Sequence, residues 1–208
     1  MNSLGNDLWR AVWSVPFLLA VLIQFFILQT SGFQSELYHM SVPLVCTFPY
    51  TCAWLDESRS GFTKLALPRT SVFWYIAGKF IACAAAGGLA ELAAVLLLQH
   101  TKPQNDLPED LALIFLCGAF WAGIAALLAA ASGSKYSAYG GAFVLCYFLV
   151  ILHERYWKAC YFLDPAEWLS PQQPWMLGTD GVKLMLGGLL LLTGLSYALI
   201  LERRLSHG

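Results

Sequence analysis

Residues 72–98 read VFWYIAGKFIACAAAGGLAELAAVLLL, a run of 27 residues in which Lys79 and Glu91 are the only charged side chains. At about 1.5 Å per residue, this run would form a helix about 40 Å long. The hydrocarbon core of a bilayer is only about 30 Å thick, so such a helix must tilt or project beyond it. The stretch therefore predicts a membrane-spanning helix and an all-α membrane protein.

The composition of the whole chain agrees with this prediction. Of 208 residues, 58% are hydrophobic and 12% are charged, with a mean hydropathy of +0.60, whereas soluble domains average about 25% charged residues. The net charge is −1 and the basic residues form no stripe, which excludes a nucleic-acid partner. Five of the six cysteines lie in apolar runs, where a free thiol behaves as a small hydrophobe, so we expect no disulfide framework.

Six apolar runs predict a single transmembrane domain over residues 1–208. The predicted spans are 11–28, 37–55, 72–98, 111–131, 138–152 and 182–201. The second contains Pro43 and Pro49 and is expected to be bent or broken. The fifth is short and is expected to extend into its flanks. The first lacks the basic region and cleavage site of a signal peptide, so we expect it to be retained as a span.

The distribution of Lys and Arg predicts the orientation, because cytoplasmic loops carry the excess of basic residues. Seven fall on one side of the predicted spans: Arg10, Arg59, Lys64, Arg69, Lys135, Arg203 and Arg204. Three fall on the other: Lys102, Arg155 and Lys158. This excess predicts a multi-pass protein of the cell membrane with both termini in the cytoplasm. Residues 2–10, with Leu4 and Leu8 four residues apart, predict a helix along the inner membrane surface.

Common catalytic signatures are missing from the sequence. Gly78-Lys79 is followed by Phe80 instead of the Ser or Thr of a phosphate-binding loop, so the chain is expected to bind no ATP of its own. His153-Glu154 begins like a zinc-protease motif, but Trp157 stands where the second His would be. We therefore predict no catalytic residue, no metal site and no cofactor bound by this chain.

Lys79 and Glu91 are the intramembrane charges of the longest run. Such charges are costly and by default suggest a functional site, although both are near enough to a helix end to snorkel or to form a short buried pair. They lie twelve residues apart, about 18 Å along a helix, which is too far for them to pair with each other. We expect Glu91 to be buried between helices or to face a polar cavity. Alternatively, both residues serve packing alone.

Small residues recur at every fourth position in the third and fourth runs and predict close helix packing. They are Ala82, Ala86, Ala90 and Ala94 in the third run, and Gly118, Ala122, Ala126 and Ala130 in the fourth.

The loop DESRSGFTKLALPR, residues 56–69, is the most informative cytoplasmic segment. A helix continuing from the second span through Leu67 would end before Pro68 and would place Phe62 and Leu65 on one face. Lying flat under the membrane, such a helix could dock into a groove of another protein. The alternative is a solvated loop with one helical turn.

The motif from Glu57 to Phe80 resembles the type-2 ABC exporter permeases. Its parts are Glu57, Gly61, Leu65, Pro68-Arg69, the aromatic stretch Phe73-Trp74-Tyr75, and Gly78-Lys79-Phe80. The resemblance implies a short cytoplasmic coupling helix that docks on a separate ABC ATPase. The coupling residues implied are Asp56, Glu57, Arg59, Gly61, Phe62, Lys64, Leu65, Pro68 and Arg69.

The same resemblance implies the partners and the substrates. Two permease subunits, identical or related, would enclose the route, and two cytoplasmic ATPase subunits would carry the ATP and Mg²⁺. Peptides, drugs or lipid-like molecules would be exported. Leu169-Ser170-Pro171 is similar to the turn at which these permeases form re-entrant helices before the last span. Aromatic residues and prolines over residues 155–175 agree with a segment that lies at the membrane interface.

Two alternatives from other classes remain open at this stage. One is an intramembrane protease or lipid-modifying enzyme that uses Glu91, His153 and Glu154. The other is a non-transporting scaffold of a membrane complex.

Overall fold

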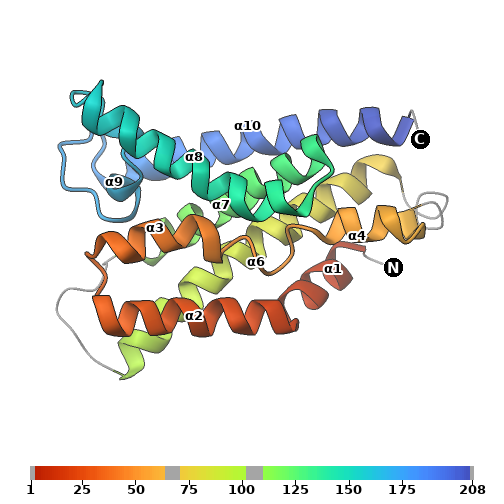
Figure 1. The fold of residues 1–208 in the computed structure, drawn as a ribbon, viewed down its shortest axis with the longest axis horizontal. Coiled ribbons are helices and arrows are strands. Elements are labelled where there is room, and N and C mark those ends of the chain that lie inside the picture. Colours follow the sequence, from red (N-terminus) through yellow and green to blue (C-terminus); the bar gives the residue numbers. More distant parts are fainter. Residues whose placement is uncertain (1–2, 64–70, 102–109, 207–208) are drawn as a thin grey trace.

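The computed structural model describes residues 3–63, 71–101 and 110–206, and every regular element in these ranges is a helix (Figure 1). The helices are α1 (Ser3–Val12), α2 (Val15–Ser31), α3 (Glu36–Val45), α4 (Ala53–Arg59), α6 (Val72–Thr101), α7 (Leu111–Ser132), α8 (Lys135–Arg155), η2 (Tyr161–Leu163), α9 (Pro165–Leu169) and α10 (Thr179–Ser206). The predicted all-α class is confirmed for the described residues.

Four helices are long and apolar enough to cross a membrane, namely α6, α7, α8 and α10. A fifth crossing results if α1 and α2, which meet at an angle of 50°, are taken as one bent span. The chain is therefore a helical protein of the multi-pass membrane type. The third, fourth and sixth predicted runs each form one helix, and the fifth extends into both flanks as expected.

The second predicted span, 37–55, is not a single helix. It consists of α3 and α4, joined by a turn over residues 46–52 that contains Pro49. A proline has no backbone N–H to continue a helical ladder, so the break expected from the two prolines is confirmed. The carbonyl of Leu44 at the helix end accepts from both the hydroxyl of Thr47, at 2.7 Å, and its backbone N–H, at 3.3 Å. Together α3, the turn and α4 extend from one end of the bundle to the other (Figure 1).

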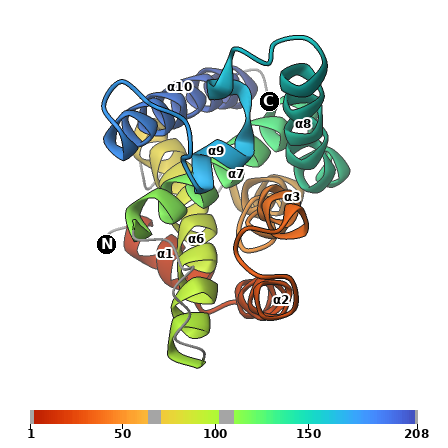
Figure 2. The same cartoon turned by 90° about the vertical axis from the view of Figure 1, so that its left-hand side faces the viewer.

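Helices α6 and α7 form the centre of the bundle, with α2, α3, α8 and α10 around them (Figure 2). The two stripes of small residues are buried within the bundle, as expected of packing faces. The α6 residues that meet α7 lie one position further along, at Gly87 and Glu91, whereas Ala90 of the α6 stripe packs with α2 and α3. A Cβ placed on Gly118 of α7 would lie 2.8 Å from the Cγ of Glu91 and 2.9 Å from the carbonyl of Gly87. Only glycine permits this approach of the two backbones.

The two ends of the bundle differ. Both termini lie at one end (Figure 1), where α1 packs against α6 through its buried face, Asp7 and Ala11. The expected N-terminal helix is therefore present, with Trp9 65% exposed on its other face. At the opposite end, α9 folds back over α7, and its buried Trp168 stacks on Trp121 with ring centroids 5.6 Å apart. Within residues 155–175, α9 is packed against the bundle, whereas residues 155–159 and 172–174 are exposed; the position of this segment at the membrane interface stays a prediction.

The close contact at Gly118 yields a stability prediction. Gly118→Ala should destabilise the protein by about 1–3 kcal/mol, because the new methyl group would overlap Glu91 and the backbone of Gly87. The matched control is Gly188→Ala on α10, where no atom lies within 4 Å of the new methyl group. It should be neutral or stabilising by about 0.5–1 kcal/mol, because alanine favours the helix. Thermal unfolding in detergent measures both, and equal effects would contradict the packing argument.

Candidate functional site

A buried network of charges lies at the end of the bundle that carries both termini. The ammonium group of Lys79 in α6 donates to Asp7 Oδ1 in α1 at 2.7 Å and to Glu57 Oε1 in α4 at 2.6 Å. The side chains of all three residues are at most 10% exposed. One cation therefore joins three helices that are far apart in sequence.

Two tyrosines and one arginine complete the network. The Tyr50 hydroxyl donates to Asp7 Oδ1 at 2.7 Å, and the Tyr75 hydroxyl donates to Glu57 Oε2 at 2.9 Å. The Lys79 ammonium also lies 5.5 Å and 5.6 Å from the ring centroids of these two tyrosines. Arg10, whose side chain is 62% exposed, reaches Glu57 Oε1 at 3.5 Å. Two carboxylates thus face two cations, so the formal charges balance.

The local fold explains why these groups meet. The turn after α3 takes Tyr50 out of helical geometry and brings its hydroxyl to Asp7. Gly78, beside Lys79, has no side chain between α6 and α1; a Cβ there would be 3.9 Å from the Cα of Leu4. Within α4, Trp54, Leu55 and Glu57 are buried, which turns the carboxylate of Glu57 toward α6.

This network of Lys79, Asp7 and Glu57, the buried joint, holds α1, α4 and α6 in fixed positions relative to one another. Ion pairs removed from water are strong only while every partner stays in place, and loss of one leaves an unpaired buried charge. Its hydrogen bonds fix α4, the segment that leads into the 56–69 loop, to α1 and α6. Movement of α4 would therefore be transmitted to both of these helices.

The neighbouring loop residues bind the turn between α7 and α8. Asp56 forms an ion pair of 2.5 Å with Lys135, and Arg59 donates to the carbonyl of Gly133 at 3.1 Å. Arg204 near the C-terminus donates to the carbonyl of Ala131 at 2.7 Å. Loops that are separate in sequence are thereby joined into one surface.

The structure corrects two expectations for the 56–69 loop. Glu57 is among the residues implied to dock on the ATPase, but it is 7% exposed and bound to Lys79, so it does not face a partner here. The expected helix through Leu67 is also interrupted, because α4 ends at Arg59 and Gly61 adopts a φ of +75°. This left-handed conformation favours glycine and redirects the chain.

Phe62 follows this bend and is 48% exposed. Of the implied coupling residues, Lys64, Leu65, Pro68 and Arg69 lie outside the described residues.

Glu91 is fully buried between helices, as expected. Its carboxylate lies beside the amide of Gln24, and this is the side-chain interaction seen for Glu91 among the described residues. The hydroxyl of Ser41 donates to Gln24 Oε1 at 3.1 Å. Glu91 is therefore a separate site from Lys79, which has its own carboxylate partners.

The residues of the enzyme alternative are not joined in the described part of the chain. Glu91 contacts α7, whereas His153 Nε2 lies 3.9 Å from Asp164, and Glu154 is exposed at the end of α8. The described residues also contain no group of three or more His, Cys, Asp or Glu side chains that could hold a metal ion.

Sequence reasoning missed Asp7, Tyr50 and Tyr75. The available signal was chemical: an intramembrane lysine requires a carboxylate, and Asp7 is the acidic residue of the first predicted helix. Which carboxylate pairs with Lys79 is decided by tertiary packing, which a hydropathy profile does not contain.

The network predicts a specific pattern of destabilisation. Lys79→Met should reduce the free energy of unfolding by about 3–5 kcal/mol, because Asp7 and Glu57 would remain buried without their cation. In the control, Lys135→Met removes only the exposed ion pair with Asp56 and should cost about 0–1 kcal/mol. The neutral triple variant Asp7→Asn, Glu57→Gln and Lys79→Met should recover most of the loss. Chemical denaturation in detergent measures all three; similar losses for the two lysine variants would refute a buried joint.

Comparison of the chain with protein-family models, with curated proteins and with solved structures finds no match.

Proposed function

We propose that the chain is the membrane-spanning permease subunit of an ATP-driven ABC exporter. The observation that carries the proposal is the buried joint of Lys79, Asp7 and Glu57, because it links the segment leading into the 56–69 loop to α1 and α6. A subunit driven by a separate ATPase needs such a connection between a docking loop and its spans. The motif from Glu57 to Phe80 supports the choice of family, because it resembles the type-2 ABC exporter permeases. The buried joint gives a physical role to two residues of this motif, Glu57 and Lys79.

The topology of the proposal has six crossings. In this topology the bent pair α1 and α2 would be the first crossing. The broken segment α3–turn–α4, which extends from one end of the bundle to the other, would be the second. Arg59, Lys135 and Arg204 all contact neighbours at the end that carries both termini. An excess of basic residues at this end favours its cytoplasmic location in the cell membrane.

In the proposed mechanism, two cytoplasmic ATPase subunits bind ATP and Mg²⁺ and receive the 56–69 loops of two permease subunits, identical or related. Exposed Phe62 would enter a groove of the ATPase and lose contact with water. Closure of the ATPases would move α4, and the buried joint would carry this movement into α1 and α6. A peptide, drug or lipid-like molecule would cross between the two permease subunits.

The topology predicts which cysteines react from each side of the membrane. Native Cys160, half-buried at the end remote from the termini, should react with an impermeant maleimide on intact cells, whereas the other five cysteines are buried. A Ser60→Cys variant, at an exposed position after α4, should gain labelling only after permeabilisation. Labelling of this added thiol in intact cells would reverse the orientation and remove the docking argument.

The docking prediction concerns the exposed aromatic residue of the loop. Phe62→Ala combined with Leu65→Ala should reduce ATPase co-purification about tenfold or more, because an anchor residue in a groove carries about 1.5–3 kcal/mol. The control is Phe162→Ala, which removes a phenylalanine that is also 48% exposed but lies at the opposite end. Normal ATPase capture and normal transport by the double variant would refute the proposal.

A further inference from the structure

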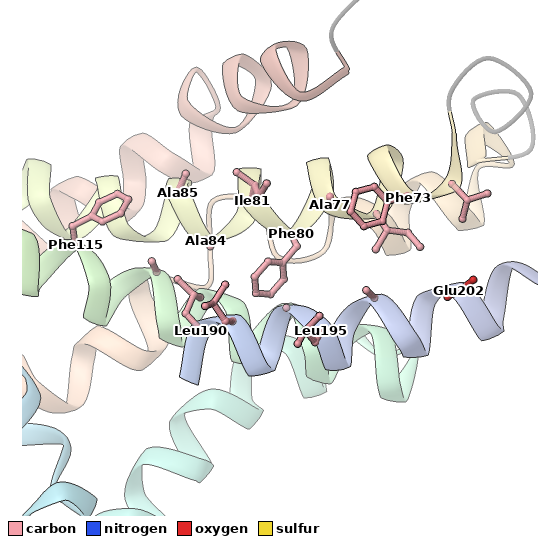
Figure 3. A pocket seen from close by; sticks show the side chains of 16 residues that line it. Phe73, Ala77, Phe80, Ile81, Ala84, Ala85, Phe115, Leu190, Leu195 and Glu202 are labelled. Atoms are coloured by element: carbon pink, nitrogen blue, oxygen red, sulfur yellow. The ribbon is translucent and has the colours of Figure 1, made fainter. Parts of the chain in front are cut away.

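An apolar groove opens sideways between α6 and α10, with α7 as its floor (Figure 3). Its volume is about 520 Å³. The lining side chains include Phe73, Ile81, Phe115 and Leu195, and Glu202 is the only charged side chain among the described residues that line the groove. Because Ile81 and Leu195 are 45% and 64% exposed, the outer rim of the groove faces the bilayer.

The groove exists because α6 and α10 both pack along α7 and diverge from each other (Figure 2). Phe80 projects from α6 into the space between them, as Figure 3 shows. Its ring lies against Gly194 of α10, where a Cβ would be only 2.9 Å away. The aromatic ring holds the two helices apart at this level.

The size of the groove suits a hydrocarbon chain. From Phe73 to Ala85 the groove follows α6 for twelve residues, about 18 Å. Its volume of about 520 Å³ over this length accommodates a single acyl chain that enters from the side.

The position of the groove matches one leaflet. It begins near Val72, at the end that carries both termini, and reaches the middle of α6. Its length of about 18 Å is close to half the thickness of the hydrocarbon core, about 15 Å. A lipid chain entering from this interface would run along the groove to the bilayer centre.

The charge at its mouth selects the headgroup. Glu202 lies at the same end of the groove as Phe73, and Phe115 lies at the other end (Figure 3). A carboxylate at the level of lipid headgroups attracts an ammonium group and repels an anionic headgroup.

From these observations we infer that the groove binds one acyl chain of an amine-headed lipid from the leaflet at the termini, with the ammonium group beside Glu202. Burial of the chain against apolar side chains supplies the affinity, and the carboxylate supplies the preference for the headgroup. The site does not depend on the proposed transport function, because lipid binding requires neither an ATPase nor a second permease subunit.

Photo-crosslinking of the purified chain in nanodiscs tests this site. The probe is a phosphatidylethanolamine with a diazirine in the middle of one acyl chain. Crosslinks should map to the groove walls near Ile81 and Leu190, and Ala77→Phe with Ala198→Phe should reduce them about tenfold by filling the groove. The control pair Leu192→Phe and Leu199→Phe adds the same aromatic rings on the exposed face of α10 outside the groove and should leave them unchanged.

The headgroup is tested with a phosphatidylglycerol probe that has the same acyl chains. The wild type should crosslink the amine-headed probe about threefold more than the anionic one, as expected of a solvent-accessible charge pair. Glu202→Gln should remove this preference and leave the groove labelled. Equal labelling of the two probes by the wild type would overturn the headgroup assignment. Labelling of the exposed face of α2 as strong as that of the groove, or labelling that persists in the filled variant, would overturn the site.

Discussion

The arrangement of the terminus-bearing end depends on one buried cation. Lys79 lies within the apolar helix α6, where an unpaired ammonium group would be very costly, so the chain must supply carboxylates from elsewhere. Asp7 and Glu57 come from segments 72 and 22 residues away. The need to neutralise one charge therefore fixes the positions of α1 and α4 on α6, and with them the direction in which the loop after α4 begins.

The same requirement accounts for the irregular second segment. A continuous helix over 37–55 would keep every backbone group bonded, yet the chain breaks between α3 and α4. The break places the Tyr50 hydroxyl on Asp7 and lets α4 direct Glu57 inward. The Thr47 hydroxyl donates to the backbone where α3 ends. The backbone irregularity therefore lies next to the charged network, whose side chains it brings together.

The long helices could be predicted from the sequence because each corresponds to one continuous apolar run, such as 72–98 or 111–131. The small-residue stripe of α7 likewise identified the face of that helix that contacts α6, since spacing along one helix defines its face. On α6 the residues that meet α7, Gly87 and Glu91, lie one position beyond the predicted stripe. Glu57 was misplaced for the opposite reason. Its environment depends on Lys79 in another helix, and an acidic residue in a polar loop is locally indistinguishable from a solvated one. The bend at Gly61 differs from the expected continuous helix through Leu67, because glycine permits a left-handed φ without requiring it.

Neighbouring residues of α6 connect the charged joint with the lipid-facing groove. Successive side chains on a helix point about 100° apart, so Lys79 faces α1 and α4 while Phe80 faces α10. A rotation or shift of α6 produced at the joint would move the Phe80 ring against Gly194 and change the width of the groove. Conversely, a chain occupying the groove would resist such a movement. The packing of one helix thus couples a polar cluster at the terminus-bearing end to an apolar surface in the membrane, with no direct contact between the two.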